Sequence, residues 1–184
     1  MIFQIENKNI HASDAGQGID LNKETIVFLH GSGLSHIVWS LTEQYFSNHK
    51  FNVLSIDLPG HGYTSGPIFH KIEDHSLFCI DVFEEIKIKD PIVIGHSWGG
   101  LVALDLSTKF KNKMTICMNI AYPFLVGDML LDYAKGNLDQ AVEFLMKYGV
   151  YKFPKTEIKT TEDMIEAGKK LLSYGAKNVL IKGG

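Results

Sequence analysis

A glycine-rich turn between an apolar strand and an amphipathic helix restricts the fold of this chain more than any other feature. Residues 91–94 predict a short buried strand, and residues 98–110 carry apolar side chains at helical spacing. Between them the chain contains the pattern G-x-S-x-G, with the serine at position 97. This pattern predicts a sharp strand-to-helix bend that raises the Ser97 hydroxyl from the sheet. Gly95 and Gly99 are then required because larger neighbours would collide at the bend.

Strands and helices alternate through most of the remaining chain. Short apolar runs predict the strands, and apolar residues three or four apart predict the helices. The alternation predicts an α/β fold, with a mostly parallel sheet and flanking helices. Besides the strand at 91–94 and the helix at 98–110, the predicted elements are a hairpin at 2–5 and 8–12, strands at 25–29, 51–56 and 114–120, and helices at 36–48 and 73–86.

The pattern changes after Pro123. Apolar residues at helical spacing predict one helix near residues 126–133 and a second that begins at the N-cap Asn137 and ends at Gly149. Two consecutive helices without a strand between them indicate an insertion over the sheet, a short helical cap. The predicted organisation is a core of residues 1–124, a helical cap of residues 125–154 and a helix-strand tail of residues 155–184.

Composition argues against several classes of partner. The net charge is −3 and the basic residues are scattered, so neither nucleic acid nor an anionic membrane is an expected partner. No apolar stretch approaches the ~18 residues of a membrane helix, and the N-terminus does not resemble a signal peptide. We therefore expect a soluble, cytoplasmic protein. Cys79 and Cys117 lie in apolar periodic segments, so we expect both to be core residues, and a disulfide between them is an open alternative. No Cys/His cluster has metal-ligand spacing.

Two further loops follow predicted buried strands. Residues 30–33 read His-Gly-Ser-Gly, and residues 57–62 read Asp-Leu-Pro-Gly-His-Gly. Together with the turn around Ser97, and in this order, the loops resemble the α/β-hydrolase superfamily over about residues 1–150. The resemblance implies a hydrolytic enzyme that needs no cofactor and no metal.

The resemblance also implies roles for individual residues. Ser97 would attack the carbonyl carbon of a small ester, thioester or other acyl substrate. The backbone N–H groups of Trp98 and of Ser32 or Gly33 would bind the resulting oxyanion. The cap would contact an apolar acyl group through three side chains: Met129, Leu130 and Leu138.

The catalytic triad of that family is incomplete in this sequence. The family places an acid and then a histidine after the nucleophile. All eight histidines lie at or before position 96, and we expect neither His30 nor His96 to act as the base. The candidate acidic residues after the nucleophile, none of which follows a strand in the expected way, are Asp105, Asp128 and Asp132. A weakly active hydrolase and a non-catalytic binding domain of the same fold therefore both stay open.

The tail carries a second resemblance. Residues 155–184 are similar to a segment of the hydroxymethylpyrimidine kinases, within the ribokinase-like family. The segment contains none of that family's catalytic loop, so kinase activity is not implied. The same stretch also fits the helix-strand unit that precedes the acid in α/β-hydrolases. Under either interpretation we expect a C-terminally truncated, fused or chimeric chain, and the sequence leaves its oligomeric state open.

Overall fold

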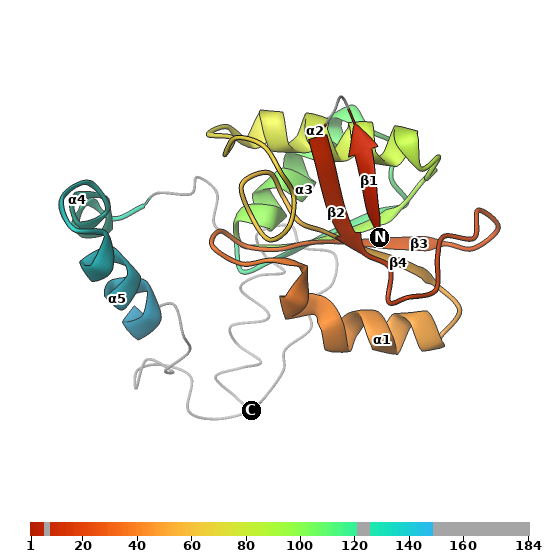
Figure 1. The fold of residues 1–184 in the computed structure, drawn as a ribbon, viewed down its shortest axis with the longest axis horizontal. Helices are drawn as coiled ribbons and strands as arrows, with labels where there is room; N and C mark the ends of the chain where they lie inside the picture. Colours follow the sequence, from red (N-terminus) through yellow and green to blue (C-terminus); the bar gives the residue numbers. More distant parts are fainter. Residues whose placement is uncertain (6–7, 121–125, 149–184) are drawn as a thin grey trace, which may run out of the picture. The chain divides into compact units, whose positions relative to one another are not determined.

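The computed structural model describes residues 1–5, 8–120 and 126–148 (Figure 1). The chain divides into two compact units, Met1–Leu125 and Val126–Gly184. The first unit contains a sheet whose strand order, within the described residues, is β1-β2-β4-β3-β5-β6. The strands are β1 (Ile2–Ile5), β2 (Lys8–Ser13), β3 (Thr25–Leu29), β4 (Asn52–Ile56), β5 (Ile92–His96) and β6 (Met114–Met118).

The four strands from β3 to β6 are parallel, and β2 joins them antiparallel to β4. The predicted hairpin is present, because β1 pairs antiparallel with β2. The carboxyl ends of β3, β4 and β5 therefore meet at one edge of the sheet. The loops that begin at His30, Asp57 and Ser97 all leave from that edge.

Alternating side chains of β3 explain why this strand is apolar throughout. Val27 and Leu29 belong to one buried cluster, whereas Ile26 and Phe28 belong to a second. Successive residues of a strand point to opposite faces, so both faces of the sheet are covered here. The parallel pairing of β3, β4, β5 and β6 confirms the predicted mostly parallel sheet.

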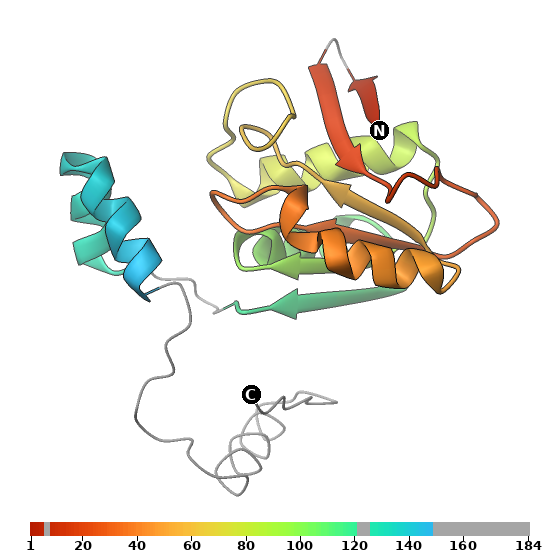
Figure 2. The same ribbon diagram turned by 60° about the horizontal axis from the view of Figure 1, so that its bottom comes forward.

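Helices cover the sheet on both faces (Figures 1 and 2). The 3-10 helix η1 (His36–Trp39) and α1 (Ser40–Asn48) lie on one face, where Trp39 packs against Phe28. On the other face, α2 (Ile72–Glu85) and α3 (Trp98–Lys109) contribute the larger buried cluster. The sequence predicted a single helix over residues 36–48, and the structure divides it into the η1 turn followed by α1.

The strand β6 differs from its neighbours in burial. Met114, Ile116 and Met118 are exposed, and β6 pairs with a strand on one side only among the described residues. Sequence patterns did not indicate this difference, because apolar content is similar in β6 and in the buried strands.

The second unit contains α4 (Asp128–Gly136) and α5 (Leu138–Tyr148). The two predicted consecutive helices are present, and the Asn137 side chain accepts a hydrogen bond from the Gln140 N–H at 3.2 Å, as an N-cap does. Gly149 and the whole predicted tail, including its kinase-like segment, lie outside the described residues. No helix in the described part of the chain is both long and apolar enough to cross a membrane.

Candidate functional site

Ser97 occupies the bend between β5 and α3. Its backbone has φ 53° and ψ −118°, a conformation that non-glycine residues rarely adopt. The bend is fixed by hydrogen bonds on both sides: the Ser97 N–H donates to the Met118 carbonyl at 2.9 Å, and the Gly100 N–H donates to the Ser97 carbonyl at 2.9 Å. Ser97 itself is half-buried, so the strained residue is not sealed in the interior.

Close backbone packing explains the two glycines that flank Ser97. A Cβ added to Gly95 would collide with the backbone of Gly99 and would lie 2.7 Å from the Gly100 Cα. A Cβ added to Gly99 would collide with the end of β3, at 2.6 Å from the Leu29 carbonyl carbon. The start of α3 therefore presses directly on the ends of β5 and β3, and this contact holds the bend in place.

The loop of residues 30–33 lies beside the bend. A Cβ added to Gly31 would lie 3.3 Å from the Ser97 Cβ. Of the predicted oxyanion donors, Trp98 directly follows Ser97 in the chain, and Ser32 and Gly33 follow Gly31 in the neighbouring loop. The Gly33 N–H donates to His61 Nε2 at 3.1 Å, so in this conformation Gly33 is engaged elsewhere. The oxyanion roles stay predictions.

His30 is a structural link between the ends of β3 and β4. Its ring is fully buried, and its Nδ1 donates to the Gly31 carbonyl at 2.8 Å while its Nε2 accepts from the Leu58 N–H at 3.0 Å. Burial lowers the pKa of His30, which agrees with a neutral ring that both donates and accepts. With both nitrogens occupied, His30 is poorly placed to take a proton from Ser97. The other candidate, His96, has its Nε2 3.5 Å from Asn119 Nδ2.

The three candidate acids of the triad differ in their partners and exposure. Asp105 accepts hydrogen bonds from Ser76 and Lys109. Partial burial raises the pKa of Asp105, but these two hydrogen bonds outweigh it and hold the pKa below its ordinary value. Asp128 and Asp132 are exposed on α4, in the second unit.

The predicted acyl-binding residues also belong to the second unit. Met129 and Leu138 are exposed, and Leu130 is half-buried. Their part in substrate binding stays a prediction.

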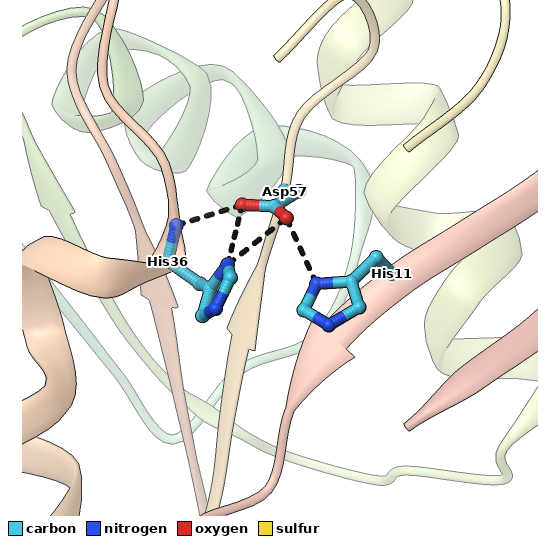
Figure 3. A group of neighbouring side chains, drawn as sticks. All are labelled: His11, His36 and Asp57. Atoms are coloured by element: carbon cyan, nitrogen blue, oxygen red, sulfur yellow. Dashed lines mark hydrogen bonds and ion pairs between the residues drawn. The ribbon is translucent and has the colours of Figure 1, made fainter. Parts of the chain in front are cut away.

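One cluster at the same sheet edge was missed by sequence reasoning. Asp57, at the end of β4, is fully buried and lies against two imidazoles (Figure 3). Its Oδ2 is 2.8 Å from His11 Nδ1, and His36 Nδ1 is 2.9 Å from both carboxylate oxygens. Sequence reasoning gave Asp57 no catalytic or binding role. The one signal in the sequence was an aspartate directly after a buried strand, because its partners are 46 and 21 residues away in the chain.

Backbone groups complete the surroundings of Asp57. The N–H groups of His36 and Tyr63 donate to its two oxygens at 2.7 Å and 3.0 Å. Burial raises the pKa of Asp57, but these backbone hydrogen bonds and the His36 side chain outweigh it and hold the pKa below its ordinary value. Of the described residues, His11, His36 and Asp57 also form a group whose potential ligand atoms lie within 4.8 Å of one another, close enough to be considered as a metal site.

Comparison with known proteins agrees with this architecture. A family model described as "Alpha/beta hydrolase family" matches residues 26–165. The chain is 32% identical over 110 residues to the pimeloyl-acyl-carrier protein methyl ester esterase of Vibrio cholerae, a match that covers 58% of this chain and 38% of that protein. It is 24% identical to the bifunctional epoxide hydrolase 2 of Sus scrofa over 63% of this chain and 20% of that protein.

Solved structures show the same fold. Est816, described as an N-acyl homoserine lactone degrading enzyme, superposes with a TM-score of 0.67 at 17% identity, covering 94% of this chain and 63% of that one. The chain spans only about a third of the length of the first curated relatives it matches. The predicted α/β-hydrolase fold is confirmed. The kinase-like resemblance of the tail stays a prediction.

Proposed function

This chain belongs to the alpha/beta hydrolase family, and from that premise we propose that it is a serine hydrolase of small esters, thioesters or related acyl compounds. Ser97 is the proposed nucleophile. The observation that carries the proposal is the strained backbone of Ser97 between β5 and α3, at φ 53°. Strain of this kind persists only where the surrounding structure enforces it, and it gathers at functional sites.

The proposed reaction is acyl transfer through a covalent intermediate. The Ser97 Oγ attacks the acyl carbon and its proton passes to a base, while the Trp98 N–H and an N–H of the 30–33 loop hold the negative oxygen. The alcohol or thiol then leaves with a proton. Water hydrolyses the acyl-serine and releases the acid. The position of Gly31 against Ser97 supports the oxyanion part of this scheme.

The proposed reaction requires an acceptor for the Ser97 proton. No histidine follows position 96 within these 184 residues, and His30 uses both of its ring nitrogens elsewhere. In subtilisin, loss of one essential triad member costs on the order of 10⁶ in turnover, although roughly 10³–10⁴ over water remains. We therefore propose that this polypeptide alone hydrolyses acyl substrates slowly.

Hydrolysis of p-nitrophenyl acetate, butyrate and octanoate tests the proposal. We expect slow, saturable release of p-nitrophenol above the uncatalysed rate, and its loss in Ser97→Ala. Ser107→Ala is the matched control, since Ser107 is exposed on α3 and its hydroxyl donates to the Leu104 carbonyl. Equal rates for the wild type and Ser97→Ala would contradict the proposal and favour a binding domain of the same fold.

A further inference from the structure

We propose that His11, His36 and Asp57 form a binding site for a divalent transition metal ion, with Zn²⁺ as the best match. The site is separate from the proposed nucleophile, and its residues come from three different elements. His11 lies on β2, His36 begins η1, and Asp57 follows β4. One ligand atom from each residue lies within 4.8 Å of the other two.

The interatomic distances fit a metal with little rearrangement. Asp57 Oδ2 lies 2.8 Å from His11 Nδ1 and 2.9 Å from His36 Nδ1. Ligands arranged tetrahedrally around zinc at about 2.0–2.2 Å are themselves about 3.3–3.6 Å apart. A small outward movement of the two imidazoles therefore opens the site. Each neutral ring would carry its proton on Nε2 instead of Nδ1 and offer the Nδ1 lone pair, so no net proton transfer is needed.

Burial defines the direction from which the ion enters. The Asp57 side chain has no exposed surface, whereas each of the two imidazole side chains is 16% exposed. A Cβ added to Gly62 would collide with the carboxylate, so the backbone closes the site on that side. The metal ion would therefore enter past the partly exposed imidazoles, and a water molecule on that side would complete its coordination. Three protein ligands with one open position are common at zinc sites.

Surrounding hydrogen bonds hold the carboxylate ready for an ion. The His36 and Tyr63 N–H groups donate to the two oxygens and fix the plane of the carboxylate. Groups that orient a ligand in this way strengthen metal binding. The two rings are already close, with centroids 4.5 Å apart. Imidazole ligands favour Zn²⁺, Co²⁺ or Ni²⁺ over Mg²⁺ and Ca²⁺, which prefer sets of oxygen ligands.

Titration of the full chain with ZnCl₂ and CoCl₂, after removal of metal with EDTA, tests the site. Isothermal titration calorimetry should give one saturable Zn²⁺ equivalent per chain. His11→Gln and His36→Gln should each weaken binding at least about tenfold. His70→Gln is the matched control, because His70 is an exposed histidine outside the cluster, and this variant should bind as the wild type does.

Two readouts separate this site from the alternatives. Bound Co²⁺ should show visible absorption without a thiolate charge-transfer band, and the absorption should be lost in both cluster variants. A thiolate band would place the ion at Cys79 or Cys117 and overturn the proposal. The proposal would also be overturned if the wild type bound no Zn²⁺, or if His11→Gln and His36→Gln both bound Zn²⁺ as tightly as His70→Gln. The cluster would then act only as a hydrogen-bonded link between loops.

Discussion

The chain bends sharply at the ends of β4 and β5, the two strands that flank β3, but different forces hold the two bends. After β5, backbone packs on backbone, and Gly95 and Gly99 leave no room for a side chain. After β4, the buried carboxylate of Asp57 accepts hydrogen bonds from two backbone N–H groups and contacts two imidazoles, and the two imidazoles come from distant segments of the chain. The first bend is thus set by shape and the second by hydrogen bonds and charge.

This difference decides which bend can be recognised in a sequence. A bend held by shape needs small residues at fixed spacing around the serine, and that spacing is visible in the chain. A bend held by a buried aspartate needs only donors that the fold brings near it. Those donors come from β2, η1 and the loop after β4, so no local pattern indicates them.

Of Gly99→Ala, Asp57→Asn and Ser97→Gly, the first should have the largest effect. The added methyl group would meet the end of β3, and overpacking of this kind against backbone costs about 3 kcal/mol of unfolding free energy. Urea unfolding measures the loss. Gly136→Ala is the control, since nothing lies within 4 Å of its added Cβ and it lies inside α4, and it should not lower stability. Equal effects of the two substitutions would refute the packing argument for the β5 bend.

Asp57→Asn should come next, with a loss of about 2 kcal/mol at neutral pH, because hydrogen bonds to a buried charged acceptor are weakened. The loss should depend on pH. The pKa of Asp57 is lowered in the folded protein, so its contribution is complete above the unfolded-state pKa and is lost as the pH falls toward the folded-state value.

The stability gap between wild type and Asp57→Asn should therefore be wide near pH 7 and should narrow below about pH 4. Urea unfolding of both proteins across this range measures the gap. Asp20 and Asp105, whose pKa values are also lowered, are present in both proteins and largely cancel. A gap that stayed constant with pH would show that the β4 bend does not depend on the carboxylate charge.

Ser97→Gly should give the smallest effect and the opposite sign. Glycine adopts a positive φ without strain, so relief of strain should exceed the entropic cost and stabilise the fold by about 1 kcal/mol. Thermal unfolding would show a raised Tm. Ser107→Gly, inside the helix α3 that follows the bend, should instead destabilise by about 0.5 kcal/mol. A lowered Tm for Ser97→Gly would mean that the serine side chain, and not the backbone, stabilises the bend.

Sequence patterns predicted most of the described fold and only part of the candidate site. Strands such as β3 were recognisable because both faces are buried, which makes every residue apolar. The Ser97 bend was recognisable through its glycines. The exposure of β6 was not, because burial depends on which strand comes last in the sheet of the described residues, and Met114 or Ile116 would suit either position. The Asp57 cluster depends on tertiary contacts between segments far apart in sequence.

Reaction with a fluorophosphonate probe most directly tests the central claim, that Ser97 is a nucleophilic hydroxyl presented at a strained bend. We expect one label per folded chain, located at Ser97 by mass spectrometry of the proteolysed protein and absent from Ser97→Ala. A folded chain that takes up no label, or a label that persists in Ser97→Ala, would contradict it.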